Sequence, residues 1–154
     1  MALSDEELDR YARHIVLPQV GGAGQLRLKA ARIAVVGAGG IGAGAIPPLT
    51  GAGVGHLTII DDDRVELSNL QRQPLYSANQ VGERKADLAA RFVGKRNPHV
   101  ECRTVADRIE RDNADAILSE HDLIIDGTDN FASRLAVPTS ARCDRNKERK
   151  LLRS

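Results

Sequence analysis

The sequence predicts an α/β fold of the Rossmann-like type, a three-layer domain with a mainly parallel sheet. Short aliphatic runs alternate along the chain with helical segments, which is typical of parallel strands joined by crossover helices. The first of these runs leads directly into a glycine loop, Gly-Ala-Gly-Gly-Ile-Gly, that extends from Gly37 to Gly42. Aromatic residues make up only 3% of the chain, so the core has to be built from aliphatic side chains.

The N-terminal part of the chain predicts one helix followed by a break. Ser4 and Glu7 form a capping box, which favours a helix that continues towards Ile15. Pro18 and the pair Gly21-Gly22 then predict an interruption of regular structure.

Two buried strands flank the helix that follows the glycine loop. The aliphatic runs Arg32–Val36 and His56–Ile60 both have the composition of buried parallel strands. The helix between them is expected to end near Gly51. Because Pro47 and Pro48 fall inside it, the helix is expected to kink or to end early, with a loosened nucleotide pocket beside it.

The remaining elements repeat the alternation of helix and strand. Residues 64–81 show no clear periodicity and predict a long functional loop. Residues 83–95 predict a helix that closes at Asn97-Pro98, and residues 112–119 predict a short helix capped by Asp112. Residues 100–105 and 122–126 are expected to be strands.

Composition excludes several classes of function. A formal net charge of +1 lacks the basic excess of a nucleic-acid binder, and no apolar run is long enough to span a membrane. The two cysteines, Cys102 and Cys143, do not make a disulfide framework, and the N-terminus is acidic where a secretion signal is basic. We therefore expect a cytoplasmic protein of one main domain, with no nucleic-acid or membrane partner.

The glycine loop predicts a nucleotide site. Gly37, Gly39 and Gly42 fit the G-x-G-x-x-G pattern between a strand and a helix. Glycines let the backbone approach phosphates closely, and the helix N-terminus offers free amide groups. Asp61 ends the next strand, where a carboxylate accepts hydrogen bonds from ribose hydroxyls. The loop suits both a dinucleotide such as NAD and a nucleoside triphosphate.

Polar residues further along the chain favour the triphosphate. Arg72 lies in the long loop, and its planar guanidinium suits phosphate. Lys85 opens the next helix with a compact positive charge, and Asp129 follows the last predicted strand, where its carboxylate suits Mg²⁺. A triphosphate needs such cations and a metal, whereas NAD needs none of them. The sequence therefore predicts an ATP and Mg²⁺ site at the carboxyl ends of the strands.

These motifs, in this order, resemble the ubiquitin-activating-enzyme-like superfamily, and within it the adenylyltransferases of the MoeB/ThiF type. The motifs are the glycine loop, residues 53–61, residues 68–73 and the Asp-Gly-Thr-Asp-Asn run at 126–130, and the resemblance covers residues 3–135. It implies adenylylation, with Mg-ATP, of the C-terminal carboxylate of a ubiquitin-like sulfur-carrier protein of the MoaD/ThiS type. It also implies a homodimer in which Arg13 reaches into the partner's ATP site.

The resemblance implies a role for individual residues. The catalytic residues would be Arg13, Arg72, Lys85 and Asp129, with Asp129 as the Mg²⁺ ligand. The nucleotide would be bound by Gly37, Gly39, Gly40, Gly42, Asp61, Asp63, Ser68, Asn69, Leu70, Gln71, Arg72, Lys85, Asp129 and Asn130. Taken singly, each cation has the alternative of an ordinary surface residue, and Asp129 has that of a helix N-cap. The histidines and cysteines show no metal-ligand spacing, so no zinc site is predicted.

The chain is expected to divide into an ATP-binding domain at residues 1–137 and a basic tail with little ordered structure at 138–154. The resemblance implies further strands beyond this point, so we expect a truncated member whose sheet is incomplete at the C-terminal end and whose activity is impaired. The first alternative is a non-catalytic nucleotide-binding or interaction module. The second is an NAD(P)-dependent oxidoreductase, which would leave residues 68–73 and Asp129 unexplained.

Overall fold

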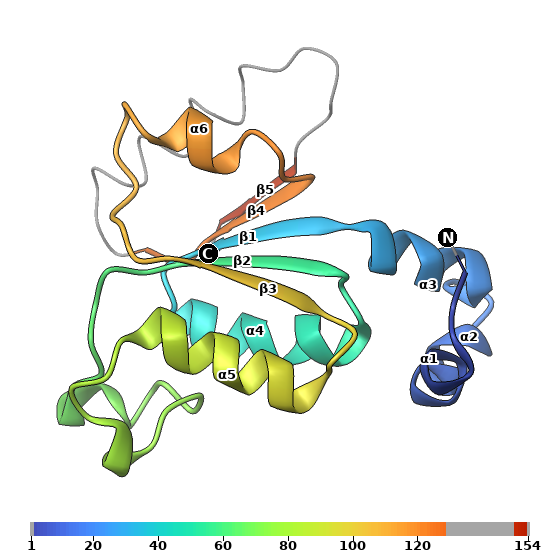
Figure 1. Ribbon diagram of the computed structural model, residues 1–154, viewed down its shortest axis with the longest axis horizontal. Helices are drawn as coiled ribbons and strands as arrows, with labels where there is room; N and C mark the ends of the chain where they lie inside the picture. The colour runs from blue at the N-terminus through green and yellow to red at the C-terminus, as the bar shows by residue number, and fades with distance from the viewer. Residues whose placement is uncertain (1, 129–149, 154) are drawn as a thin grey trace.

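The computed structural model describes residues 2–128 and 150–153, and it confirms the α/β fold. Its sheet has the strand order β3-β2-β1-β4-β5, and all neighbouring strands pair in parallel. The strands are β1 (Arg32–Val36), β2 (His56–Ile60), β3 (Glu101–Val105), β4 (Leu123–Asp126) and β5 (Lys150–Arg153). Figure 1 shows α4 and α5 on one face of this sheet and α6 on the other.

The structure has more helices than the sequence predicts, but the predicted bounds of α4, α5 and α6 lie within a few residues of those observed. They are α1 (Asp5–Arg10), α2 (Ala12–Ile15), α3 (Gly21–Ala30), α4 (Gly40–Ala52), α5 (Lys85–Arg96) and α6 (Ala114–Leu118). Two short 3₁₀ helices, η1 (Leu67–Asn69) and η2 (Ala78–Gln80), lie inside the long loop. In the part of the chain that is described, no helix has the length and apolar character to cross a bilayer.

The core lies on both faces of the sheet because side chains alternate along each strand. On one face Val35 and Ile59 pack with Ile46 of α4, and all three are fully buried. On the other face Ala34 and Ile124 pack with residues of α6. Burial on both sides explains why β1 and β2 are mainly aliphatic, and why the sequence predicts their bounds correctly.

The N-terminal helices correct one expectation and confirm another. The capping box is present, since Ser4 Oγ accepts from the Glu7 amide and Glu7 Oε2 accepts from the Ser4 amide. The predicted interruption is present at Pro18, between α2 and α3, but its extension to Gly21-Gly22 is wrong, because α3 begins there. Gly21 has a φ of 60°, a conformation that glycine adopts without strain, and it turns the chain into the helix.

The early end predicted for the proline-containing helix is also wrong. α4 continues through Pro47 and Pro48 to Ala52. Ile46 anchors the helix in the core, and the Thr50 hydroxyl donates to the Ile46 carbonyl at 2.8 Å. These contacts offset the hydrogen bonds that the prolines cannot make. A loosened pocket beside this helix stays a prediction.

The last helix and the C-terminal segment also differ from expectation. Asn113, not Asp112, occupies the N-cap position of α6. Its side chain instead links the Glu110 amide and the Arg108 carbonyl, which ties the preceding loop together. In the segment predicted to be a tail, Lys150–Arg153 form β5, whereas residues 138–149 lie outside the described residues. The division into domain and tail stays a prediction.

His121 should make the domain less stable in acid. The side chain is buried, its Nε2 lies 2.7 Å from Thr58 Oγ1, and burial lowers the pKa of His121. Because the pKa of His121 is lower in the folded state than in the unfolded state, the neutral side chain stabilises the fold at pH values above its unfolded pKa of about 6.5. This stabilisation is lost as the pH falls towards the pKa of the folded state. Thermal unfolding between pH 7.5 and 5 should therefore show a smaller acid loss in His121→Asn than in the wild type. Equal loss of stability with falling pH in His121→Asn and the wild type would contradict this prediction. His56→Gln, which removes a histidine from an exposed ion pair, is the control.

Candidate functional site

A cleft of about 540 Å³ opens at the carboxyl ends of the strands. Its walls come from the glycine loop after β1, the end of β2, the long loop, and the loops after β3 and β4. The predicted site residues that line it are Gly37, Gly39, Gly40, Asp61, Asp63, Asn69, Arg72 and Lys85. The structure therefore brings most of the predicted residues together around one cavity.

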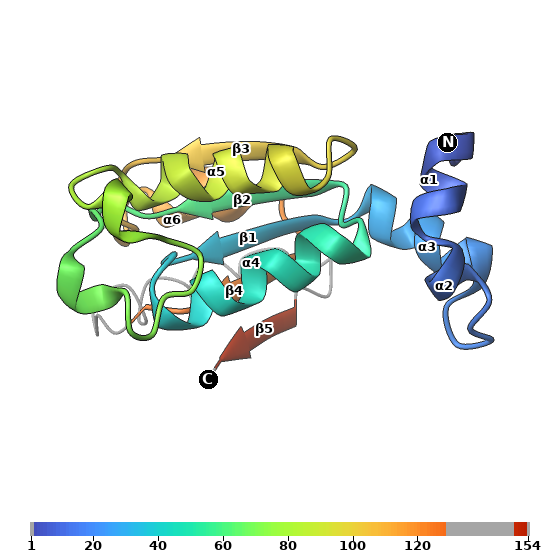
Figure 2. The ribbon, with the colours of Figure 1, turned by 90° about the horizontal axis from the view of Figure 1, so that it is seen from below.

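The other predicted residues have different places. Gly42 lies beneath the glycine loop, and Ser68, Leu70 and Gln71 are not among the lining residues. Asp129 and Asn130, and with them the predicted Mg²⁺ ligand, lie outside the described residues. Arg13 is exposed on α2, at the opposite end of the sheet from the cleft (Figure 2).

The glycine loop is fixed by the strands on both sides of it. The Gly37 amide donates to the Ile60 carbonyl at 2.8 Å, and the Gly127 amide donates to the Val36 carbonyl at 2.9 Å. Gly37 has a φ of 84°, which favours glycine. Gly39 caps α4 without a side-chain hydrogen bond, so the first amides of α4 remain available to an anion in the cleft.

Asp61 connects the end of β2 to the glycine loop. Its Oδ2 accepts from the Ala38 amide at 2.6 Å, and its Oδ1 accepts from the Asp63 amide at 2.8 Å. Burial raises the pKa of Asp61, although these two hydrogen bonds and the nearby Lys85 act to lower it. Each carboxylate oxygen accepts more than one hydrogen bond, so the same group that holds the loop is also able to accept from a ribose hydroxyl.

Lys85 is a buried cation at the base of the cleft. It is only 5% exposed, and its Nζ donates to Asp63 Oδ2 at 2.9 Å. The Asp63 side chain is 60% exposed, so it is free to be hydrated if Lys85 takes another partner. The ammonium group thus stands beside the glycine loop with a partner that an anionic ligand is able to replace.

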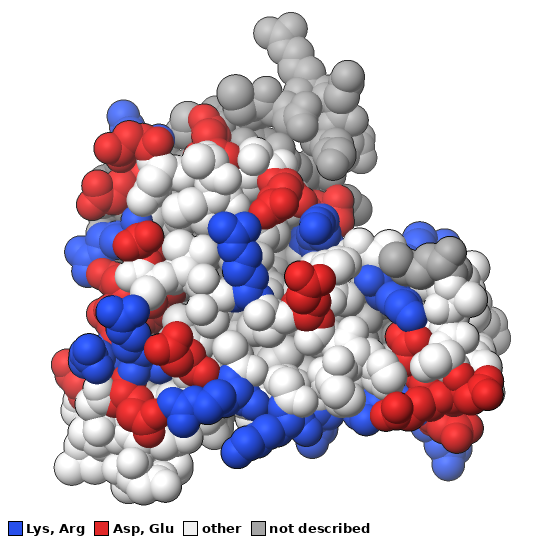
Figure 3. Space-filling model, viewed as in Figure 1, with Lys and Arg blue, Asp and Glu red and all other residues white. Residues whose placement is uncertain are grey.

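Three neighbouring carboxylates line this part of the cleft. Oxygens of Asp61, Asp62 and Asp63 lie within 4.8 Å of one another. Each has its own partner, since Asp61 accepts from the Ala38 amide, Asp63 pairs with Lys85, and Asp62 accepts from Arg108 Nε at 3.1 Å. Figure 3 likewise shows acidic and basic side chains intermixed along this edge of the molecule.

Sequence reasoning missed several residues of the cleft. Among them are Gln73, which is 3% exposed, and the residues Asp107, Arg108 and Ile109 that follow β3. The rule that ligands bind at the carboxyl ends of parallel strands applies to β3 as well as to β1 and β2. It could have singled out the residues after β3. Cys102, on β3, does not line the cleft, and burial raises the pKa of its thiol to about 11.

Tyr76 ties the glycine loop to the start of α5. The buried Tyr76 hydroxyl donates to the Ala38 carbonyl at 2.8 Å, and burial raises its pKa. Tyr76→Phe leaves the Ala38 carbonyl without this donor, and we expect a loss of about 1–2 kcal/mol in unfolding free energy together with several-fold weaker ATP binding. Denaturant unfolding and calorimetric titration measure the two effects.

Tyr11→Phe provides the matched control for that variant. Tyr11 is also buried, and its hydroxyl accepts from Asn97 Nδ2 at 2.8 Å. It joins α1 to α2, and these helices lie at the opposite end of the domain from the carboxyl ends of the strands (Figure 2). Measured in an Arg13→Ala background, which removes any effect through the neighbouring Arg13, Tyr11→Phe is expected to lower stability and to leave ATP affinity unchanged. Equal losses of affinity in both variants would attribute the effect to global stability and not to the glycine loop.

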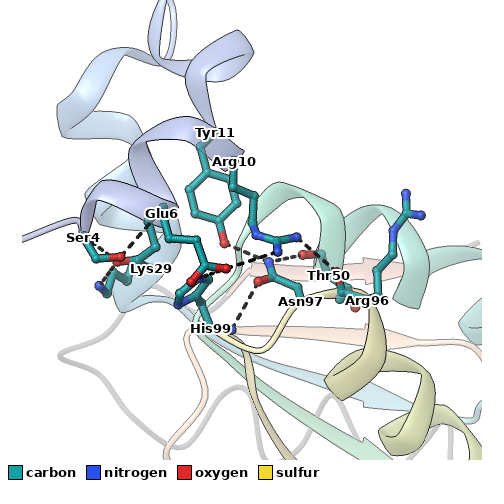
Figure 4. A network of polar contacts seen from close by, with 10 residues as sticks. Ser4, Glu6, Arg10, Tyr11, Lys29, Thr50, Arg96, Asn97 and His99 are labelled. Carbon is teal, nitrogen blue, oxygen red and sulfur yellow. Dashed lines mark hydrogen bonds and ion pairs between the residues drawn. The ribbon is translucent and has the colours of Figure 1, made fainter.

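The helices that carry Arg13 are anchored to the domain by a polar network (Figure 4). Asn97 donates to both the Tyr11 hydroxyl and the Thr50 carbonyl, which joins α1 and α2 to the ends of α4 and α5. A Cβ on Gly53 would lie 2.5 Å from the Tyr11 ring, so only glycine permits this approach. The network places the exposed Arg13 on a surface fixed to the sheet.

Known proteins are similar to this chain in sequence and in fold. The ThiF family matches residues 11–148. The SAMP-activating enzyme E1 of Haloferax volcanii is 46% identical over 134 residues, 87% of this chain and 50% of that protein. The sulfur carrier protein adenylyltransferase of Thermus thermophilus is 46% identical over 141 residues, 92% of this chain and 52% of that protein. The chain thus spans about half the length of these curated relatives.

A solved structure shows the same fold with a nucleotide. It is the crystal structure of Escherichia coli tRNA N6-threonylcarbamoyladenosine dehydratase, TcdA, in complex with ATP. The TM-score is 0.90 at 29% identity, and the match covers 99% of this chain and 61% of that one.

Proposed function

This chain belongs to the ThiF family, and from that membership we propose that it uses Mg-ATP to adenylylate the C-terminal carboxylate of a ubiquitin-like sulfur-carrier protein in the cytoplasm. The observation that carries the proposal is one cleft that combines an open helix N-terminus, the ribose-binding candidate Asp61, and the cations Arg72 and Lys85. An NAD site would leave these cations without a role.

In the proposed reaction, a carboxylate oxygen of the carrier attacks the α-phosphorus of ATP. A new bond forms between that oxygen and phosphorus, and the bond from the α-phosphorus to the bridging oxygen breaks, which releases pyrophosphate. The amides of α4, Arg72 and Lys85 stabilise the negative charge that develops on the phosphates. Asp129 is the proposed ligand of Mg²⁺, which supplies further charge neutralisation when it is bound. No covalent nucleophile is needed.

ATP–pyrophosphate exchange in the presence of a purified sulfur-carrier protein tests this proposal. Exchange that requires the carrier and is lost in Asp129→Ala is the expected result. ATP binding without exchange would favour a non-catalytic nucleotide-binding module. Tight binding of NAD with no binding of ATP would overturn the proposal and favour an oxidoreductase.

We further propose a homodimer in which Arg13 acts in the partner's cleft. Arg13 is exposed on α2, which lies at the opposite end of the sheet from the cleft of its own chain (Figure 2). It can therefore reach an ATP cleft only in a second copy of the chain. The test mixes two inactive variants, Arg13→Ala and Lys85→Ala. Half of the dimers would be mixed and one of their two sites intact, which restores about a quarter of the wild-type exchange activity. No recovery on mixing would contradict an Arg13 role in the partner.

A further inference from the structure

The segments that line the cleft follow three neighbouring strands, in the order β1, β2 and β3 across the sheet. The glycine loop follows β1, Asp61 follows β2, and Asp107, Arg108 and Ile109 follow β3, which is the next strand outward. A nucleotide with its phosphates at the glycine loop and its ribose at Asp61 extends in that same direction. Its base therefore lies against the loop after β3. This step rests on the function proposed above.

Arg108 is held firmly in that loop. Its Nε donates to Asp62 Oδ2 at 3.1 Å, and its carbonyl accepts from Asn113 Nδ2 at 2.9 Å. The next residue, Ile109, is 2% exposed and packs in the core between the sheet and α6. The guanidinium group is thus fixed at one edge by Asp62, while the Arg108 side chain remains 52% exposed at the cleft.

The lining of the cleft offers few other surfaces for a planar base. None of the described lining residues is aromatic, and the chain as a whole has two tyrosines, two phenylalanines and no tryptophan. A guanidinium group is planar and delocalised, and nucleobases stack on it as they do on aromatic rings. Arg108 is the arginine of the cleft that stands one strand beyond the ribose-binding candidate.

We propose that Arg108, oriented by Asp62, is the platform on which the base of the nucleotide stacks. Stacking recognises the flat face of a base and not its hydrogen-bonding edge. Arg108 therefore contributes to the affinity for ATP and for GTP alike, and it contributes nothing to the binding of a triphosphate that has no base.

Calorimetric titration of the full chain with ATP and with ribose 5-triphosphate, which lacks a base, separates stacking from attraction between charges. We expect Arg108→Ala to weaken ATP binding about tenfold and to leave the binding of ribose 5-triphosphate unchanged. Arg108→Lys keeps the positive charge but not the plane, and should weaken ATP binding nearly as much. Arg103→Ala is the matched control, because Arg103 is an exposed arginine on β3 that pairs with Glu120 and does not line the cleft.

Two results would overturn the proposal. One is an equal loss for both ligands, which would show that Arg108 acts only through its charge. The other is unchanged ATP binding in Arg108→Ala with a melting temperature equal to that of the wild type. A base-dependent loss without any pyrophosphate exchange in the wild type would support the stacking role and refute the adenylylation proposed above. Normal pyrophosphate exchange together with unchanged ATP affinity in Arg108→Ala would support the adenylylation and refute the stacking role.

Discussion

Gly42→Ala is expected to abolish ATP binding and to destabilise the domain. A Cβ at this position would lie 1.9 Å from the Gly37 carbonyl oxygen and 2.9 Å from the Gly37 carbonyl carbon. Both atoms belong to the backbone of the glycine loop, so no side chain is able to move aside. Either the loop or the first turn of α4 has to shift, and we expect a loss of about 3 kcal/mol or more in unfolding free energy. Denaturant unfolding and calorimetric titration with ATP measure these effects.

Gly44→Ala is the matched control in the same helix. Gly44 is exposed, and a Cβ there would meet nothing within 4 Å. Alanine favours a helix interior more than glycine does, so this variant should gain up to about 1 kcal/mol and bind ATP as the wild type does. If Gly42→Ala behaved like Gly44→Ala in both measurements, the close approach of Gly42 to Gly37 would not be required for the site.

Lys85→Ala is expected to slow the proposed reaction strongly while the domain stays folded. Loss of a buried cation that faces the phosphates is expected to lower the pyrophosphate exchange rate by about 100- to 1000-fold. Stability should change little, because the abandoned Asp63 side chain is 60% exposed and is hydrated by solvent. Exchange kinetics and thermal unfolding of the same preparations separate a loss of activity from a loss of fold.

The control for Lys85→Ala is Lys95→Ala. Lys95 is an exposed lysine in the last turn of the same helix, and it does not line the cleft. Its removal should leave exchange unchanged. An exchange rate in Lys85→Ala within a few-fold of the wild type would contradict a phosphate-binding role for Lys85. Its ion pair with Asp63 would then have a structural role only.

The elements that the sequence predicts best are those with strong local patterns. Arg32–Val36 and His56–Ile60 are largely aliphatic because helices cover both faces of the sheet (Figure 1), so their bounds follow directly from composition. The start of α3 at Gly21 and the continuation of α4 through Pro47 depend on tertiary packing, which a local pattern does not contain.

The same distinction applies to the site. Gly37 and Asp61 are found by spacing along the chain, because the strand, turn and helix around them are consecutive. Arg108 enters the cleft only because β3 pairs with β2, and Gln73 only because the long loop folds back towards Gly39. Such contacts arise from topology and not from spacing.

The glycine loop begins where β1 is tied to both neighbouring strands, since the Gly37 amide donates to the Ile60 carbonyl of β2 and the Gly127 amide, after β4, donates to the Val36 carbonyl of β1. It therefore cannot open unless part of the sheet opens with it. The conformational entropy needed to order the phosphate-binding backbone is lost when the chain folds, and not when a nucleotide arrives. Hydrogen exchange at the Gly37 and Gly127 amides accordingly reports the opening of this part of the sheet, and a nucleotide meets a preorganised surface.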